Sequence, residues 1–188
     1  LTLRDARDYN IIGCVEPQKS GKTEGWHDAA FFNMCRPLEL VFSNGMDKGV
    51  RIGPATGNVE DMTTFEQFYD AYKKQMDYAI QLLVNADNAI DMAHAERCPL
   101  PFLSSMVDDC MKVGKTVQEG GAVYNFTGPQ GFGVANMADS LYSVKTLVYD
   151  EKKITMGELK EALATNYGKG LGAEDVAAMT AKIANELK

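Results

Sequence analysis

Apolar residues recur at intervals of three and four positions through the middle of the chain, and this pattern predicts one long helix. The apolar stripe consists of Phe65, Phe68, Tyr69, Tyr72, Met76, Ile80, Leu83 and Ile90. Residues at these spacings share one face of an α-helix. Thr63 and Glu66 have the spacing of a capping box at the helix start, and Pro99 and Pro101 end the helix after about Arg97. At ~1.5 Å per residue this helix would extend roughly 50 Å.

Shorter helices are predicted on both sides of the long one, separated by segments rich in glycine and proline. They are expected at residues 2–10, 26–44, 102–113, 136–149 and 155–166, with a modest amphipathic helix from Ala173. Pro37 should kink or break the second of them. Thr155 and Glu158 again have capping-box spacing. Residues 18–25 are polar with two glycines, which is typical of an exposed loop.

Strand-forming residues occur only in brief, widely separated runs, such as Ile11-Ile12 and residues 122–126. Strands this short are not stable as isolated pairs. Each is therefore expected to pair with strands from elsewhere in a larger protein. The chain also opens within a structural element and without a methionine, so we expect it to be part of a longer chain.

Composition and charge exclude several classes of protein. Of the 188 residues, 45% are hydrophobic and 24% are charged, which is typical of a folded chain rather than a disordered one. Lys and Arg number 19 against 26 Asp and Glu, a net charge of −7. This balance disfavours nucleic acid and anionic membrane surfaces as the main partner. No apolar run approaches the roughly 18 residues of a membrane span.

The four cysteines, at positions 14, 35, 98 and 110, do not have the spacing of a zinc site. Without a secretory context they are expected to be reduced thiols in a cytoplasm. Cys35, Cys98 and Cys110 are expected to be buried as small apolar residues. No metal site is predicted from them.

Cys14 stands apart because Glu16 follows it in the pentapeptide GCVEP. In an extended segment, residues i and i+2 point to the same side, so the thiol and the carboxylate would face one substrate together. A neighbouring carboxylate raises the pKa of a thiol and disfavours a thiolate nucleophile. The pair suits a neutral S–H that exchanges a hydrogen atom, next to a carboxylate that moves a proton. Taken alone, Cys-x-Glu is a weak signal, and a structural cysteine is the simpler interpretation.

The surrounding sequence changes that balance. GCVEP followed by QKSGKTEGWHDAAFF resembles the active-site loop of glycyl radical enzymes, the relatives of pyruvate formate-lyase, and most closely the branch that holds glycerol and propanediol dehydratases and isethionate sulfite-lyase. The resemblance continues through VNADNAIDMAHAERCPLPFLSSMVDDC, QEGGAVYNFTGPQGFGVANMADSL and KITMGELKEAL. It covers nearly all of residues 1–165, which would form the catalytic-loop portion of the enzyme. Residues 166–188 depart from the pattern and are expected to form a divergent helical tail.

The resemblance implies a fold and three site residues. The fold would be α/β, part of a ten-stranded α/β barrel that is mostly helical in this section, with the Cys14 loop inserted into the barrel lumen. Cys14 would become the thiyl radical that removes a hydrogen atom from a substrate carbon. Glu16 would accept the proton of the substrate hydroxyl, and Asp28 would contact that hydroxyl. The expected activity is that of a radical lyase.

Two reactions remain open within this branch, because both use Cys14 and Glu16 in the same roles. One cleaves the C–S bond of isethionate to give acetaldehyde and sulfite, and residues 31–49 favour it slightly. The other cleaves a C–O bond of glycerol or 1,2-propanediol. A different class is also open: a non-catalytic scaffold or binding protein derived from the family.

The resemblance also implies components that these residues do not supply. The radical-bearing glycine of the family lies in an R-V-x-G-Y-like motif, which does not occur in this sequence. The glycyl radical is therefore expected in a missing C-terminal segment, installed by an activating enzyme that uses S-adenosylmethionine and an iron–sulfur cluster. The other expected partners are a small hydroxylated substrate, the rest of the parent chain and a second copy in a homodimer. The expected location is the cytoplasm, either free or inside a bacterial microcompartment.

Three further features have simpler interpretations than chemistry. Asp87, Asp91 and His94 share a helix face and could bind a metal, but hydrogen-bonded packing against neighbouring loops is the expected role. The glycine-rich residues 128–133 lack a phosphate-binding motif and are expected to form a tight turn. Two roles are possible for His27: it could polarise the substrate, or it could simply be oriented by its neighbour Asp28.

Overall fold

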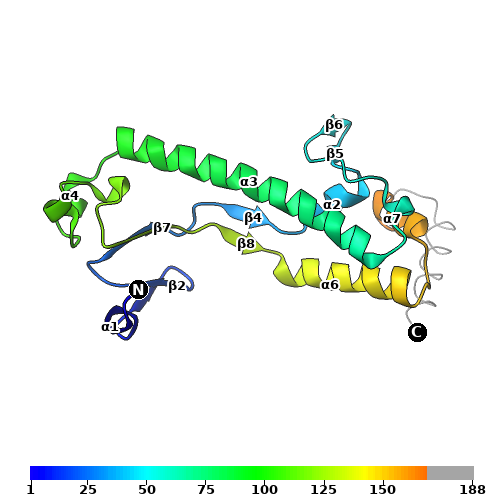
Figure 1. Ribbon diagram of the computed structural model, residues 1–188, viewed down its shortest axis with the longest axis horizontal. Coiled ribbons are helices and arrows are strands. Elements are labelled where there is room, and N and C mark those ends of the chain that lie inside the picture. Colours follow the sequence, from blue (N-terminus) through cyan, green and yellow to red (C-terminus); the bar gives the residue numbers. More distant parts are fainter. Residues whose placement is uncertain (169–188) are drawn as a thin grey trace. The chain divides into compact units, whose positions relative to one another are not determined.

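The computed structural model describes residues 1–168, so the helix expected from Ala173 lies outside the described residues. Contacts divide the chain into two units. The first comprises Leu1–Asn33 and Ile80–Phe132, and the second comprises Met34–Ala79 and the residues from Gly133 onward. The long helix α3, Phe65–Arg97, contributes to both units (Figure 1). Among the described residues, no helix is both long and apolar enough to cross a bilayer.

Helix α3 confirms the predicted long helix, but its capping box lies one residue further along the chain. The backbone N–H of Gln67 donates to Thr64 Oγ1 at 3.3 Å, and Gln67 Oε1 accepts from the backbone N–H of Thr64 at 3.3 Å and of Thr63 at 2.7 Å. The pair is therefore Thr64 and Gln67 rather than Thr63 and Glu66. Both pairs fit the sequence pattern, because glutamate and glutamine serve equally at the third helical position.

Two parallel strand pairs and one antiparallel hairpin form the sheet structure of the first unit. β3 (Thr23–Trp26) pairs with β7 (Tyr124–Thr127), and β4 (Phe31–Asn33) pairs with β8 (Gln130–Phe132). Of the loop predicted over residues 18–25, only residues 19–22 lie outside strands, and the helix predicted from residue 26 was wrong up to Arg36. Pairing partners about a hundred positions away supply the backbone hydrogen bonds of these strands, and no local pattern reports them. The strands pair with one another within the chain, whereas partners from elsewhere in a larger protein were expected.

The short helices of the first unit are more fragmented than predicted. α1 (Leu3–Ala6) starts at the expected cap, Thr2, but ends four residues before Asn10. The helix expected over 102–113 is two single turns, α4 (Pro101–Ser104) and α5 (Cys110–Val113), followed by the 3₁₀ turn η2 (Val117–Glu119). Asp109 has a left-handed φ of 73° just before α5, a conformation that no continuous helix accommodates.

The second unit holds the main hydrophobic core. Its elements are α2 (Arg36–Phe42), the hairpin strands β5 (Met46–Asp47) and β6 (Val50–Arg51), the 3₁₀ turn η1 (Val59–Asp61), α6 (Val134–Val144), the π-helical turn η3 (Lys145–Asp150) and α7 (Met156–Ala164). Phe68 of α3 is fully buried and meets the Phe42 ring edge-on, with centroids 5.5 Å apart. Pro37 lies in the first turn of α2, so the predicted break at Pro37 is the helix start. The capping box of Thr155 and Glu158 is confirmed.

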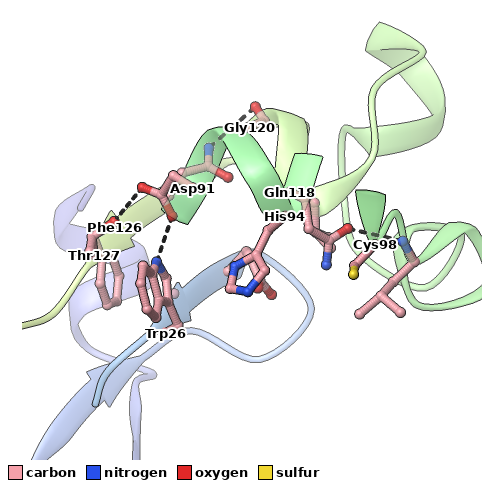
Figure 2. A pocket seen from close by; sticks show the side chains of 13 residues that line it. Trp26, Asp91, His94, Cys98, Gln118, Gly120, Phe126 and Thr127 are labelled. Carbon is pink, nitrogen blue, oxygen red and sulfur yellow. Dashed lines mark hydrogen bonds between the residues drawn. The ribbon is translucent and has the colours of Figure 1, made fainter. Parts of the chain in front are cut away.

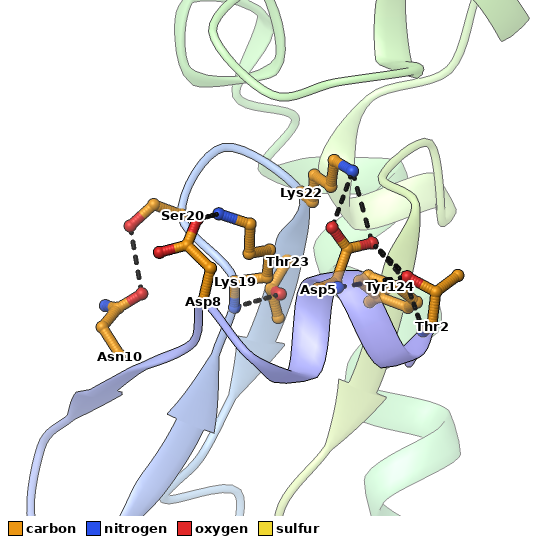
Figure 3. A network of polar contacts seen from close by, with 9 residues as sticks. All are labelled: Thr2, Asp5, Asp8, Asn10, Lys19, Ser20, Lys22, Thr23 and Tyr124. Atoms are coloured by element: carbon orange, nitrogen blue, oxygen red, sulfur yellow. Dashed lines mark hydrogen bonds and ion pairs between the residues drawn. The ribbon is translucent and has the colours of Figure 1, made fainter.

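One buried carboxylate ties the N-terminus to the parallel strands. Asp5 is only 5% exposed. Its carboxylate accepts hydrogen bonds from Tyr124 Oη at 2.8 Å, from Lys22 Nζ at 3.0 and 3.3 Å, and from Thr2 Oγ1 at 3.1 Å (Figure 3). The bond from Tyr124, followed by that from Lys22, lowers the pKa of Asp5 from 3.8 to about 2. The ionised form of Asp5 thus joins α1, β7 and the loop before β3.

We expect Asp5→Asn to loosen α1 and strand β1 (Asn10–Ile12) in the full-length protein at neutral pH. The lowered folded pKa means that the ionised carboxylate stabilises this region fully above about pH 4 and loses that effect as the pH falls towards 2. Hydrogen exchange of residues 3–12 should therefore be faster in the variant at pH 7, and the difference should shrink below pH 4.

Asp8→Asn is the matched control for this experiment. Asp8 pairs with Lys19 at 2.6 Å, but its side chain is 84% exposed, and exposed ion pairs contribute little to stability. Equal exchange rates in the Asp5 and Asp8 variants would contradict the assigned role of Asp5.

Candidate active site

Cys14 lies at the tip of a small antiparallel hairpin. β1 pairs with β2 (Glu16–Gln18), with Ile12 opposite Glu16, and residues 13–15 form the turn. The expectation of an extended segment through Cys14 was wrong, because Gly13 adopts a left-handed φ of +63°. The left-handed backbone favours glycine, and a Cβ at Gly13 would lie 2.6 Å from Glu16 Oε2, so a larger residue would displace that carboxylate. The Cys14 side chain is exposed at this turn.

The Glu16 carboxylate folds back over the turn that carries Cys14. Its Oε2 accepts from the backbone N–H of Cys14 at 2.7 Å and of Val15 at 2.9 Å. Hydrogen bonds from backbone N–H groups, that of Val15 first, lower the pKa of the Glu16 carboxyl, and the charge of His27 adds a smaller effect. The carboxylate is therefore ionised at neutral pH. Glu16 is thus held next to Cys14 by the turn backbone rather than by strand alternation.

Gln130 joins Glu16 to Asp28. The Gln130 side-chain Nε2 donates to Glu16 Oε1 at 3.0 Å and also donates to Asp28 Oδ1. The parallel pairing of β4 with β8 positions Gln130, whose backbone N–H donates to the carbonyl of Ala30 at 2.7 Å. The structure therefore brings Glu16 and Asp28 together through a residue that the sequence interpretation did not select.

The tight turn predicted for residues 128–133 was wrong. Residues 128 and 129 connect β7 to β8 without a turn, and β8 occupies Gln130–Phe132. The sequence offered one local signal for Gln130: it is the polar side chain within the segment GPQGFG, residues 128–133.

His27 contacts Gln18 and Phe126. Its Nε2 contacts Gln18 Nε2, and its ring packs against Phe126 with centroids 4.9 Å apart. Among the described residues, no hydrogen bond joins His27 to Asp28. The expectation that Asp28 orients His27 is therefore not supported by a contact.

A sequence model of the pyruvate formate lyase-like family matches residues 1–184 of the chain. The chain belongs to the pyruvate formate lyase-like family. The predicted fold class is also confirmed, because solved glycyl radical enzyme structures superpose on the chain, among them one from Archaeoglobus fulgidus with a TM-score of 0.81.

Two solved relatives of this pyruvate formate lyase-like chain dehydrate diols or triols. The chain is 64% identical to the protein of 1,2-propanediol dehydration in Roseburia inulinivorans, with a TM-score of 0.92 over 96% of this chain and 22% of that chain. It is 59% identical to the glycerol-bound, B12-independent glycerol dehydratase from Clostridium butyricum, with a TM-score of 0.88 over 95% of this chain and 22% of that chain. The chain thus spans about a fifth of these relatives.

Curated relatives include enzymes of both C–O and C–S cleavage. The chain is 40% identical to (2S)-3-sulfopropanediol dehydratase of Klebsiella oxytoca, over 89% of this chain and 20% of that protein. It is 30% identical to isethionate sulfite-lyase of Desulfovibrio desulfuricans, over 95% of this chain and 22% of that protein. The slight preference for isethionate that residues 31–49 suggested is therefore not supported by similarity, since dehydratases are the more similar of these relatives.

Asp91 and His94 on α3 of this pyruvate formate lyase-like chain pack against residues of strands β3 and β7, whereas packing against loops was predicted. Asp91 accepts from Trp26 Nε1 at 2.7 Å and from Thr127 Oγ1 at 2.9 Å, and His94 meets the Trp26 ring edge-on with centroids 5.4 Å apart (Figure 2). A cavity of about 570 Å³ adjoins these side chains. Within residues 1–168, no group of three or more His, Cys, Asp or Glu residues is arranged to hold a metal ion.

The remaining cysteines follow the prediction only in part. Cys110 is buried, and its burial raises the pKa of the thiol. Cys35 is half-buried, with Sγ 3.5 Å from the carbonyl of Gly133, whereas Cys98 is exposed at the end of α3. Burial of Cys98 was therefore wrongly predicted, because Pro99 ends the helix at a surface position.

Proposed function

We propose that the protein containing this chain is a radical dehydratase of a small vicinal diol, 1,2-propanediol or glycerol. The observation that carries the proposal is that similarity is higher to the propanediol and glycerol enzymes, at 64% and 59% identity, than to the isethionate enzyme of Desulfovibrio desulfuricans, at 30%. The arrangement around the hairpin tip supports it, because a thiol and an ionised carboxylate are adjacent there.

Cys14 and Glu16 divide the chemistry between them in this proposal. The Cys14 thiyl radical takes a hydrogen atom from the carbinol carbon, so that a C–H bond breaks and an S–H bond forms. The Glu16 carboxylate accepts the proton of the hydroxyl on that carbon, which makes the carbon radical electron-rich. The neighbouring C–O bond then breaks, and the leaving hydroxide takes the proton that Glu16 had accepted, so that water is released and Glu16 is ionised again. The product radical recovers its hydrogen atom from Cys14 and becomes the aldehyde.

The remaining site residues bind and orient the substrate. Asp28 is exposed beside Glu16 and can accept a hydrogen bond from a second hydroxyl. Its single bond to Gln130 leaves other lone pairs of its carboxylate available. Two carboxylates around one small guest favour a substrate rich in hydroxyl donors over an anionic sulfonate, which they would repel.

The radical itself would come from a glycyl residue outside this sequence, generated by a separate activating enzyme. When present, that group supplies the one-electron oxidation of the Cys14 thiol. The fit with this chain rests on Cys14, because its thiol is unbridged and exposed at the tip of a turn whose backbone is fixed by Glu16. A homodimer, a cytoplasmic location and a microcompartment remain predictions.

The test is activation of the full-length protein without oxygen, followed by separate assays with 1,2-propanediol, glycerol and isethionate. The glycyl radical is quantified by electron paramagnetic resonance before each assay. We expect aldehyde from one of the polyols and no sulfite from isethionate. Sulfite release without aldehyde from either polyol would overturn the proposed substrate class. A full radical signal without turnover of any of the three would favour the non-catalytic scaffold.

A further inference from the structure

A single side-chain amide connects two carboxylates that come from different parts of the first unit. Glu16 starts strand β2, and Asp28 lies in the connection between β3 and β4. Gln130, on strand β8, donates from the same Nε2 to an oxygen of each. Ionised carboxylates accept hydrogen bonds and cannot donate them, so the NH₂ side of the amide is the side that must face them.

We propose that Gln130 is a positioning residue of the proton-transfer site, which holds the Glu16 and Asp28 carboxylates together in their ionised forms and aims Glu16 at Cys14. The inference rests on the proposed function, because it assigns Gln130 a role in the proton transfer by Glu16. Gln130 does not itself exchange an atom with the substrate.

The argument for positioning starts from the repulsion between two like charges. Two carboxylates that share a site raise the pKa of one of them, unless donors between them compensate. Gln130 offers one N–H to each, which is the full donor capacity of its NH₂ group. Together with the backbone N–H groups of Cys14 and Val15, it gives both oxygens of Glu16 a donor. The carboxylate therefore has a fixed orientation before substrate binds.

The backbone of Gln130 is itself held in place. Its N–H donates to Ala30, and the ladder places Gln130 opposite Phe31, directly after the segment that carries Asp28. The titratable groups at this site are the two carboxylates that Gln130 contacts, together with His27, whose charge acts on Glu16, and the adjacent thiol of Cys14. Gln130 is uncharged, so it orders the carboxylates at any pH at which they are ionised.

The test compares Gln130→Leu and Gln130→Glu in the activated full-length protein, with glycyl radical content matched between variants. Gln130→Leu should lower kcat/KM for the polyol roughly ten- to a hundred-fold, the range for misplaced catalytic groups. Its acid limb should move to higher pH, because Glu16 loses a donor. Gln130→Glu should retain more activity near pH 6 than near pH 8, because a neutral carboxyl can still donate one bond whereas a third carboxylate repels both others.

Gln81→Leu is the matched control, since Gln81 is exposed on α3 and its side-chain amide donates to Asn85 Oδ1 on the same helix. It should keep kcat/KM and the pH profile of the parent protein. A purely structural role of Gln130 predicts the same loss at every pH in both variants, and that result would overturn the proposal. Variants that keep wild-type kcat/KM would overturn it as well.

Failure of the proposed function is distinguishable from failure of this inference. If the protein releases sulfite from isethionate instead, the same variants are compared with that substrate. A measurement without turnover covers the remaining case: the crystal structure of unactivated Gln130→Leu. There Glu16 Oε2 should stay at the N–H groups of Cys14 and Val15 while Oε1, which has lost its donor, turns away from Asp28, and an unmoved Oε1 would contradict the positioning role.

Discussion

Cys14→Ser should abolish turnover in the activated full-length protein while the glycyl radical signal and the fold remain unchanged. An alcohol O–H bond is much stronger than a thiol S–H bond, so serine cannot carry the radical from which the hydrogen-atom transfer starts. The substitution removes little else, because Cys14 lies exposed in the turn and its backbone N–H still bonds to Glu16. The measurement is aldehyde formation per glycyl radical, with thermal unfolding as the check on folding.

Cys98→Ser is the matched control for this loss. Cys98 is also exposed and unbridged, but it directly follows α3 and is not part of the hairpin. The Cys98 variant should turn over at the wild-type rate. Turnover by Cys14→Ser above that of unactivated protein would remove Cys14 from the mechanism, whatever its similarity to the family's active-site loop.

Helical elements with strong local signals were predictable from the sequence. The periodic stripe of α3 and the prolines after Arg97 set its length, and Thr155 with Glu158 set the start of α7. These features depend on residues within one or two helical turns, so the sequence window contains all of the relevant interactions. The shift of the α3 cap by one residue shows the limit, because two overlapping pairs satisfied the same local rule.

The parallel strands were not predictable in this way. Residues 31–35 fit a helical stripe, yet β4 covers Phe31–Asn33 because Gln130–Phe132 lies alongside it. A three-residue strand gains its hydrogen bonds from its partner rather than from its own side chains, so its existence depends on tertiary contacts. The helix could begin only at Arg36, where Pro37 is tolerated in the first turn.

The candidate site likewise contains residues that local sequence identifies and one that only tertiary contacts identify. Cys14 and Glu16 were identified because they are two residues apart within one recognisable motif, and Asp28 because it follows in the same segment. Gln130 lies more than a hundred positions away, and only the β4–β8 pairing brings it to both carboxylates. The relation between Cys14 and Glu16 was right in proximity but wrong in geometry, since a left-handed glycine, not strand alternation, produces it.

Glu16→Gln should lower kcat by about 10²- to 10⁴-fold, the usual contribution of a positioned general base. Polyol binding should be largely retained, because the amide has the shape of the carboxylate and keeps one acceptor oxygen for the N–H groups of Cys14 and Val15. The lowered pKa of Glu16 means that the wild-type base stays ionised at acidic pH. Wild-type kcat/KM should accordingly persist to a lower pH than an ordinary glutamate would allow, and the variant should lose this acid limb.

Two further variants separate proton transfer from a role in holding the turn. Glu96→Gln makes the same chemical change at an exposed position of α3 and should leave the rate unchanged. Glu16→Asp keeps the proton acceptor but shortens its reach, so it should turn over faster than Glu16→Gln although it holds the turn less well. If Glu16 only shaped the turn, the order would reverse, because glutamine preserves the side-chain length and an acceptor oxygen while aspartate loses the length. The relative rates of these two variants therefore decide whether Glu16 acts as a base.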